Sequence, residues 1–581
     1  MSEPRPLYHW VIPSAHRLSE STIADAKRRG LSARAVRVLS RRGEVDPREL
    51  ASRFDEPEAA LLDAQSLPDA AAVRSRVGQA VTDGDSVLVL GDFDADGLTG
   101  LAILSEALGW LGIDTEPYVP DRTGEGHGLS MAAVEHAAKA GHGLIITADT
   151  GSTSIAEISA ARASGIDTIV TDHHVLGREL PDAFALVNPQ RLDSEYPDAR
   201  LSGAGVAFKV AQLLMDGRPG GAAAALELAD LAAIGSIADV VPIVGENRAI
   251  VRLGLRALEQ HPRPGLAALM ARSRVDVGNV STEDVAFSLA PRINAMGRIG
   301  DPAVAARLLL ATDAETAGQL AEELEVANRK RRDLTTTAMT EAREALGDAA
   351  GDLFIVLAGD WPVGIIGLVA GRLAEELGRP TLVLSSATDP WRGSARSAGG
   401  VDLAAAFESC SDLFERYGGH PAAAGCHIDE SRVDELRERL NAYARVRPPV
   451  DQRATLAIDL VQSADDADCV LLRELAPLED AAEAPPLVGV AGLAVVRARV
   501  ANGGHTQLLL RRGREVVDGI AFGRSDLAEQ LMEGLEIDVV ARLASRTFSG
   551  VESLQLEVRD AAPAGTLSAL VRASRPEAPS A

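Results

Sequence analysis

The chain has 581 residues, 46% of them hydrophobic and 24% charged, which is typical of a soluble globular protein with about three to five domains. Its formal net charge of −26 counts against a protein that coats nucleic acid through overall charge, although a local basic groove is compatible with it. Three cysteines without a CxxC pair predict neither disulfides nor a zinc site, and the sequence shows no signal peptide and no run of 18 apolar residues, so we expect a cytoplasmic protein.

The first half of the chain is expected to begin with a polar extension and to continue as an α/β domain. Residues 1–80 are polar and interrupted by prolines, which predicts short helices. Between residues 81 and 260, short apolar runs alternate with amphipathic stretches at 99–111, 130–140 and 153–164. This alternation predicts a parallel sheet flanked by helices.

The second half is expected to contain a helical connector, a smaller α/β domain and a β-barrel. Residues 261–350 are mostly helical, and Ala314–Leu346, which lacks proline, predicts one long helix. A second α/β domain follows at 351–446. Short strands separated by glycine turns at 450–562 predict a small barrel of the OB-fold type. Residues 563–581, rich in alanine, proline and serine, are expected to be disordered.

Acidic residues and histidines lie at the ends of apolar runs in the first α/β domain. Because the carboxyl ends of parallel strands meet at one edge of a sheet, we expect these side chains to converge. Crowded carboxylates repel one another unless cations lie among them, and two close divalent ions are the usual apparatus for cleaving phosphate esters. The residues are Asp92, Asp94 and Asp96 after the run 87–90, Asp149 after 144–146, Asp172, His173 and His174 after 169–170, and Asp239 in the segment 237–239.

The residue types in these segments indicate which metal would bind. Oxygen ligands with one neutral imidazole, that of His173, favour Mn²⁺ or Mg²⁺ over a structural zinc ion. Asp149, at the end of the second run, is a candidate bridge between two ions. A single aspartate after a strand often does no more than cap a helix, so the prediction depends on four such segments occurring in order.

Together these segments resemble the motifs of the DHH phosphoesterase superfamily and, within it, the RecJ single-strand-specific exonucleases. The resemblance extends over about residues 80–562. It implies a DHH catalytic domain at 81–260, a substrate-binding DHHA1 domain at 351–446 and a nucleic-acid-binding OB-fold at 450–562. The matching segments are Gly91–Gly97, Thr147–Asp149, Asp172–His174, Leu201–Lys209, Gly235–Pro242, Pro291–Arg298, Gly393–Ser397 and Gly418–His420.

The resemblance also implies residue roles and two bound Mn²⁺ or Mg²⁺ ions. One ion would be held by Asp94 and Asp149, and the other by Asp96, Asp149, His173 and Asp239, with Asp92 nearby. His174 would hydrogen-bond the scissile phosphate or the leaving oxygen. The residues expected to contact the substrate are Arg122, His127, Arg292, Ser394, Arg396 and His420, of which His127 stands where relatives often have tyrosine.

The implied activity is hydrolysis of single-stranded DNA from 5′ to 3′ to mononucleotides, in recombination and repair, by a monomer that cooperates with a helicase and a single-strand-binding protein. Two alternatives stay open: a phosphodiesterase acting on short oligoribonucleotides or cyclic dinucleotides, and a non-catalytic single-strand-binding scaffold. The barrel favours long strands, and the presence of all candidate ligands argues against the scaffold. The basic clusters 27–29, 329–332 and 511–514 are interpreted as solvated faces. Pro362 replaces a histidine that is common in the family.

Overall fold

The computed structural model describes residues 4–44, 46–122, 124–347, 351–447, 453, 455–479, 482–501, 503–548 and 551–574. The chain forms two compact units. Unit 1 contains Met1–Leu50, Ala342–Asp360 and Ile366–Ala581, and unit 2 contains Ala51–Glu341 and Trp361–Ile365.

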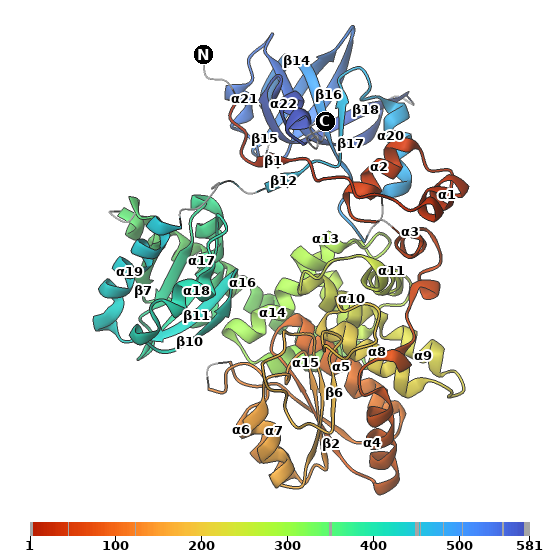
Figure 1. The fold of residues 1–581 in the computed structure, drawn as a ribbon, viewed down its shortest axis with the longest axis vertical. Helices are drawn as coiled ribbons and strands as arrows, with labels where there is room; N and C mark the ends of the chain where they lie inside the picture. Colours follow the sequence, from red (N-terminus) through yellow and green to blue (C-terminus); the bar gives the residue numbers. More distant parts are fainter. Residues whose placement is uncertain are drawn as a thin grey trace, which may run out of the picture. The chain divides into compact units, whose positions relative to one another are not determined.

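Unit 2 contains the parallel sheet that the sequence predicts (Figure 1). Its five strands lie in the order β3-β2-β4-β5-β6 and are all parallel. The central strands β2 and β4 are buried along their whole length, which explains why their sequences are continuously apolar rather than alternating. The strands are β2 Val87–Gly91, β3 Thr115–Tyr118, β4 Leu144–Ala148, β5 Asp167–Thr171 and β6 Ala185–Val187.

Helices cover both faces of this sheet (Figure 1). The helices α6 and α7 pack on one face through an apolar cluster that includes Leu88, Ile145 and Val170. The helices α4, α5 and α8 contact the sheet from the other face. The bounds are α4 Ala70–Asp83, α5 Ala95–Trp110, α6 Met131–Ala140, α7 Ile155–Ala163 and α8 Gly203–Met215, close to the predicted stretches.

The rest of unit 2 is helical. The long helix α16 has the bounds that the sequence predicts, Ala314–Leu346, and it buries Leu320, Leu324 and Ala338 at helical spacing. The other elements are α3 Pro47–Phe54, α9 Gly221–Glu227, α10 Ala229–Ala238, α11 Gly245–Gln260, α12 Pro264–Ser273, α13 Thr282–Asp284, a π-helix at Val285–Leu289, α14 Ala290–Ile299 and α15 Pro302–Leu309.

One window in unit 2 is long and apolar enough to cross a membrane. It spans Gly221–Ala238, covers α9 and α10, and is 67% buried inside the protein. A buried core helix passes the same test of length and composition, so this window is weak evidence for a membrane span.

Unit 1 contains the second predicted α/β domain, built on a mixed sheet. Its strand order is β10-β11-β9-β8-β7, with β7 and β8 parallel and the other neighbours antiparallel. The helices α18 and α19 contribute to the apolar core beneath it. The elements are β7 Ile355–Gly359, α17 Val363–Leu377, β8 Thr381–Ser385, β9 Trp391–Arg396, α18 Leu403–Glu408, β10 Phe414–His420, β11 Ala423–Ile428 and α19 Val433–Val446.

The predicted β-barrel follows in unit 1. Its strands lie in the order β13-β14-β15-β16-β18-β17, and the additional pairing of β14 with β17 closes the barrel. The long strand β14 therefore pairs with β13, β15 and β17. The elements are β12 Thr455–Ala457, β13 Leu460–Ser463, α20 Cys469–Leu475, β14 Leu487–Ala501, β15 His505–Arg512, β16 Glu515–Ala521, α21 Leu527–Gln530, β17 Glu536–Phe548 and β18 Val551–Pro563.

Both ends of the chain differ from the expectation. The N-terminal extension contains the helices α1 Glu20–Arg28 and α2 Ala33–Arg41, but it begins with a strand, β1 His9–Val11, that pairs with β12. Residues 563–574, expected to be disordered, instead contain the helix α22 Thr566–Ala573, whose Leu567 is buried in a cluster with Trp10. That burial supplies the apolar contact that composition did not reveal. Residues 575–581 lie outside the described part of the chain.

Candidate metal centre

The turn after β2 places three aspartates at the carboxyl edge of the parallel sheet. Asp94 caps α5, because its Oδ1 accepts hydrogen bonds from the backbone amides of Asp96 and Gly97, each at 3.1 Å. Gly97 is packed so closely that a Cβ there would lie 2.5 Å from the backbone nitrogen of Asp92. The cap and this close approach hold the turn in one conformation.

Asp96 connects this turn to the start of α8. Its carboxylate accepts hydrogen bonds from the amides of Gly203 at 2.7 Å and Ala204 at 2.9 Å. A Cβ at Gly203 would overlap the side chain of Asp149, so glycine is needed for this approach. The segment Leu201–Lys209, one of the motifs of the family resemblance, therefore supports the candidate ligands Asp96 and Asp149.

Asp149 follows β4 with a φ of 61°, in the left-handed region that aspartate tolerates better than most residues. Its Oδ1 lies 3.1 Å from Nε2 of His173 and 3.7 Å from Nδ1 of His174. The side chain is 4% exposed. The positive φ thus turns the carboxylate inward, between the β2 turn and the two histidines.

His173 and Asp239 complete the cluster. The Nε2 atom of His173 lies 3.6 Å from Oδ2 of Asp239 and 3.8 Å from Oδ2 of Asp96. Asp239 is the C-cap of α10 and does not follow a strand, unlike the other acidic residues of the cluster. Val240 after it has a φ of 60°, a strained conformation for a β-branched residue.

Burial and mutual repulsion shift the proton affinities of the cluster. Burial, followed by the charges of Asp239 and Asp94, raises the pKa of Asp96 to about 8. The pKa values of Asp94, Asp149 and Asp239 are also raised, in each case mainly by burial. A cation bound among these groups would lower these pKa values, because it favours the ionised carboxylates.

The two histidines differ in charge. Burial lowers the pKa of His173, which leaves a neutral imidazole suited to bind a metal. The hydrogen bond between Nδ1 of His174 and Asp172, 2.8 Å long, raises the pKa of His174 to about 9. Burial works to raise the pKa of Asp172, but hydrogen bonds from His174 and from backbone amides hold it at about 2. His174 is therefore a cation that can donate a proton or a hydrogen bond.

Three polar atoms in the cluster are buried without a hydrogen bond: Oδ1 of Asp92, Oδ1 of Asp149 and Nε2 of His173. The last two lie 3.1 Å apart, but their geometry does not form a hydrogen bond. Buried polar atoms are nearly always paired, so these atoms fit a metal site. Three overlapping groups bring their ligand atoms within 4.8 Å of one another. They are Asp92–Asp94–Asp149, Asp96–His173–Asp239 and Asp149–His173–His174. The sequence placed Asp92 only near the site, whereas the structure makes it a member of the first group.

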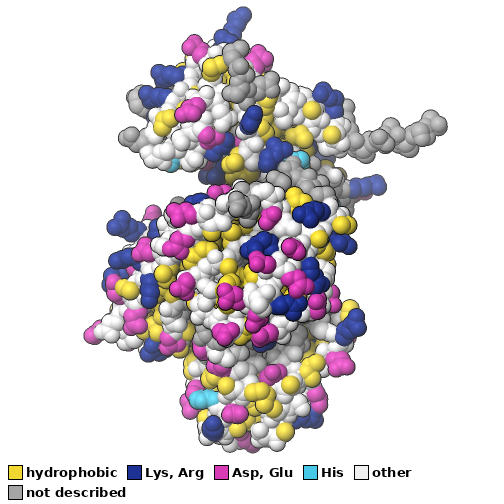
Figure 2. Space-filling model, turned by 90° about the vertical axis from the view of Figure 1, so that its left-hand side faces the viewer, with side chains coloured by type: hydrophobic (Ala, Val, Ile, Leu, Met, Phe, Trp, Pro, Cys, Tyr) yellow, Lys and Arg dark blue, Asp and Glu magenta, His cyan; other side chains and the backbone are white. Residues whose placement is uncertain are grey.

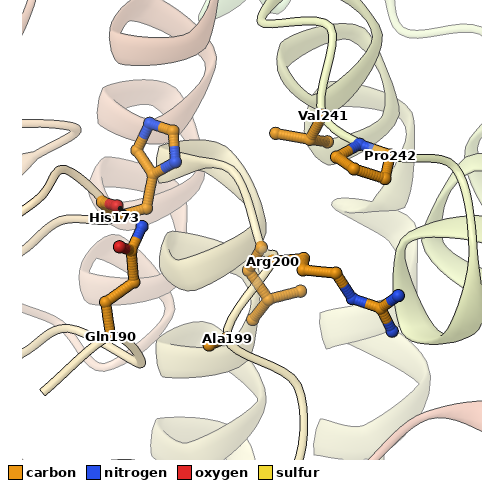
Figure 3. Close-up of a pocket in the computed structure, with 7 residues that line it drawn as sticks. His173, Gln190, Ala199, Arg200, Val241 and Pro242 are labelled. Atoms are coloured by element: carbon orange, nitrogen blue, oxygen red, sulfur yellow. Dashed lines mark hydrogen bonds between the residues drawn. The ribbon is translucent and has the colours of Figure 1, made fainter. Parts of the chain in front are cut away.

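A pocket of about 520 Å³ opens beside His173 (Figure 3). His173 and Gln190 stand on one side of it, and Val241 and Pro242 on another. Its remaining lining residues are Ala199, Arg200 and Leu201. The amide of Gln190 donates to the backbone carbonyl of His173, which helps to fix the histidine. The pocket gives the cluster access to solvent.

Two predicted substrate residues lie next to the β2 turn. The guanidinium of Arg122 stacks over the ring of Phe93 at 4.9 Å. The imidazole of His127 packs on the same ring, with centroids 4.4 Å apart, and its Nδ1 lies 3.2 Å from Oδ2 of Asp92. The structure thus brings both residues to the cluster, through a phenylalanine that sequence reasoning did not single out.

Arg292 is held within unit 2 by partners of its own. Its Nε donates to Glu325 at 2.6 Å and its Nη1 to the carbonyl of Ser288 at 2.7 Å. The same segment, Pro291–Arg298, contains Asn294, which the sequence did not indicate as a site residue. Its side-chain oxygen accepts a hydrogen bond from the amide of Ala95 at 2.6 Å. The helix α14 is therefore docked directly on the turn that carries Asp94.

The other three predicted substrate residues lie in the mixed sheet of unit 1. His420, Ala423 and Arg396 occupy one row across β10, β11 and β9. The Nη1 atom of Arg396 donates to Oγ of Ser394 at 3.0 Å, and a Cβ at Gly367 of α17 would lie 3.0 Å from its Nη2. The register of the sheet therefore brings Ser394 and Arg396 of β9 close to His420 of β10.

Family models match three parts of the chain. They are the DHH family, N-terminal domain, at residues 86–236, the DHHA1 domain at 351–445 and the RecJ OB domain at 458–560. These matches coincide with the parallel sheet, the mixed sheet and the barrel.

Curated relatives and solved structures agree with these matches. The single-stranded-DNA-specific exonuclease RecJ of Salmonella typhimurium is 32% identical over 83% of this chain and 88% of its own length. The Bacillus subtilis protein of that name is 36% identical over 84% of this chain, which spans 62% of that relative's length. The Thermus thermophilus RecJ crystal structure in complex with Mn²⁺ matches 98% of this chain and 80% of its own, with a TM-score of 0.80 and 31% identity. A Mg²⁺ complex from the same organism gives a TM-score of 0.74 at 29% identity, with 98% of this chain and 79% of the other covered. The chain belongs to the RecJ family of DHH-domain proteins.

Proposed function

We propose that this protein is a metal-dependent exonuclease that hydrolyses single-stranded DNA from 5′ to 3′ and releases mononucleotides. The observation that carries the proposal is the convergence of five side chains, in which buried ligand atoms of Asp149 and His173 form no hydrogen bond. The five are Asp94, Asp96, Asp149, His173 and Asp239. The relatives named above are single-stranded-DNA-specific exonucleases, and the solved RecJ structures contain Mn²⁺ or Mg²⁺.

Two Mn²⁺ or Mg²⁺ ions would fit the ligand groups. Asp94 and Asp149, with Asp92, would hold one ion. Asp96, Asp149, His173 and Asp239 would hold the other, since His173 belongs both to the group with Asp96 and Asp239 and to a group with Asp149. When bound, the ions supply an activated water molecule and neutralise negative charge on the scissile phosphate.

The protein's own residues would orient the reaction. His174 is half-exposed and carries a proton held by Asp172, so it can donate a hydrogen bond to the scissile phosphate or to the leaving oxygen. Arg122 and His127, beside the first ion group, would contact the terminal nucleotide. Their packing on Phe93 reduces the entropy lost on binding.

The strand would be gripped by residues from several elements. Arg292, Ser394, Arg396 and His420 would contact backbone phosphates, since a guanidinium matches phosphate oxygens in geometry and charge. The barrel offers a polar hollow of about 190 Å³ whose lining includes Arg497, Arg499 and Arg546. Basic and acidic side chains are interspersed over the face drawn in Figure 2, so binding would depend on local groups of arginines and on salt.

The wider role is part of the same proposal. The protein would act as a monomer in the cytoplasm, in recombination and repair, with a helicase to supply single strands and a single-strand-binding protein as a partner. Digestion of duplex DNA without a helicase at the rate of single strands would contradict it.

A polarity assay tests the proposed function. Single-stranded DNA labelled at the 5′ or the 3′ end is incubated with the protein, with and without Mn²⁺. The proposal expects a mononucleotide as the first product from the 5′-labelled strand, and only in the presence of metal. Release of the 3′ label first, or no cleavage in Mn²⁺ or Mg²⁺, would contradict it. Equal cleavage of short RNA would favour the oligoribonucleotide alternative.

A further inference from the structure

The π-helix at Val285–Leu289 holds an aromatic side chain in solvent. Phe287 is 79% exposed, whereas Val285 and Leu289 on either side of it are completely buried. The two buried neighbours anchor the backbone, so the ring projects from a fixed position. Single turns of π-helix are rare and are found frequently at functional sites.

This turn is rigidly connected to the candidate metal centre. It continues directly into α14, where the side chain of Asn294 accepts a hydrogen bond from the amide of Ala95, next to Asp94. Gly297, one turn later, is packed so closely that a Cβ there would lie 2.5 Å from the carbonyl oxygen of Phe93. The position of Phe287 relative to the metal-binding turn is therefore fixed by the helix.

A second connection links the turn to one face of α16. Arg292 joins the carbonyl of Ser288 to the carboxylate of Glu325, and Glu325 lies 3.9 Å from Arg329. On the adjacent face, a hollow of about 340 Å³ is lined by Val326, Arg329, Lys330, Asp333, Leu334 and Thr337.

The hollow follows the exposed side of an amphipathic helix. Its residues recur at intervals of three and four, and the eleven residue steps from Val326 to Thr337 cover about 16 Å of helix. The opposite side of α16 is buried at Leu324, Asn328 and Thr335. In the hollow two cations, Arg329 and Lys330, exceed the single carboxylate of Asp333. Glu325 lies beside the hollow and divides its charge between Arg292 at 2.6 Å and Arg329 at 3.9 Å.

We propose that Phe287 and this face of α16 together form a binding track for single-stranded DNA, hereafter the α16 track. A base stacks on Phe287, and phosphates lie on Arg329 and Lys330. Sites for single strands combine cations along the backbone with aromatic platforms for the bases, and the track has both. A protein partner would need a wider apolar surface than one phenylalanine with Val326 and Leu334. The inference rests on the proposed function. It identifies where the part of the DNA strand that lies beyond the metal centre is bound.

The stacking part is tested by binding of a fluorescent 20-nucleotide oligothymidylate to the full-length protein in EDTA, which prevents cleavage. Because stacking on one base is worth about 1 kcal/mol or more, Phe287→Ala should raise Kd at least about fivefold. Phe287→Trp should restore binding. Phe184→Ala removes another exposed phenylalanine of unit 2, just before β6, and should leave Kd unchanged.

The charge part is tested by the salt dependence of the same binding. The double change Arg329→Ala and Lys330→Ala should reduce the slope of log K against log salt by about 1.4, since each lost phosphate contact on a single strand contributes about 0.7. The control is the double change Lys139→Ala and Arg162→Ala on α6 and α7, which removes the same charge from other exposed positions.

The outcomes separate the track from the proposed function. If wild-type protein cleaves labelled single strands in Mn²⁺ but the track variants bind like their controls, the track is wrong and the function stands. If wild-type protein binds but does not cleave, the proposed function is wrong, and the Kd and salt-slope changes still test the track. A lower melting temperature for Phe287→Ala with unchanged Kd would show that the ring packs against the protein, which also overturns the track.

Discussion

Replacement of Asp149 by asparagine tests the candidate metal centre most directly. Asparagine has nearly the same size and tolerates the φ of 61° at this position, so the change removes the charge and little else. Asp149 belongs to two of the three ligand groups, and its Oδ1 is buried without a hydrogen-bond partner. The variant should therefore fold but lose metal-dependent activity.

The size of the effect follows from the geometry. The ligand atoms of Asp92, Asp94 and Asp149 lie within 4.8 Å of one another. At an effective dielectric constant of about 20, two unit charges at that distance interact by about 3.5 kcal/mol. Loss of one carboxylate forfeits at least this attraction to a divalent cation, which corresponds to about a 300-fold or greater fall in kcat/KM. Without metal, burial and the neighbouring carboxylates raise the pKa of Asp149, so its ionised form is unfavourable there, and the asparagine variant should be at least as stable as the wild type.

Two measurements check these expectations. Hydrolysis of a labelled single strand in saturating Mn²⁺ gives kcat/KM, and thermal unfolding in EDTA and in Mn²⁺ gives the stability and its response to metal. Asp182→Asn, at an exposed residue paired with Arg162, is the matched control. Turnover by Asp149→Asn within about tenfold of the wild type would refute the bridging role, and a normal Mn²⁺-induced rise in melting temperature would refute ligation by this carboxylate.

Three further predictions concern pH and substrate grip. The folded-state pKa of Asp96 is raised to about 8, so the folded protein holds this proton more tightly than the unfolded chain. The resulting stability of the metal-free protein is fully present below about pH 4 and is lost as the pH rises through 8. A melting temperature in EDTA that stays constant from about pH 5 to 8 would contradict this. Arg396→Ala should raise KM for single strands more than it lowers kcat, because the residue lies in the mixed sheet of unit 1 rather than in the metal cluster, and an unchanged KM would count against a phosphate contact. The double change Arg499→Ala and Arg546→Ala in the barrel should weaken binding of a 20-nucleotide strand and leave hydrolysis of a dinucleotide unchanged; equal effects on both substrates would remove this hollow from the mechanism.

Local sequence patterns predicted the interior of unit 2 well. The runs at 87–90 and 144–146 became the buried strands β2 and β4, because a strand covered on both faces must be apolar throughout. The helix Ala314–Leu346 was predicted with its observed bounds, since no proline interrupts its pattern. These features depend on interactions between neighbours in sequence or on burial on both sides.

The two ends of the chain were not predictable from local pattern. The strand β1 forms because it pairs with β12, which lies more than 400 residues away in the chain, with His9 opposite Thr455. Just before the strand, the carboxylate of Asp560 accepts hydrogen bonds from the amides of Leu7 and Tyr8. The helix α22 is ordered because Leu567 enters the same apolar cluster as Trp10. The two partners of each of these contacts are hundreds of residues apart, so no local sequence pattern contains both. For this reason the sequence predicted only a polar N-terminal extension and a disordered C-terminal tail.

The sequence by itself determined which residue types could bind metal and, because strands in a parallel sheet end at one edge, that Asp94, Asp149 and His173 would lie together. Only the tertiary structure decided that Asp92 joins a ligand group, that Asp239 reaches the cluster from the end of a helix, and that Asn294 and Phe93 support it. The physical reason is range: strand ends follow from hydrophobic periodicity over a few residues, whereas the direction of each side chain depends on backbone turns and packing partners that are distant in the chain.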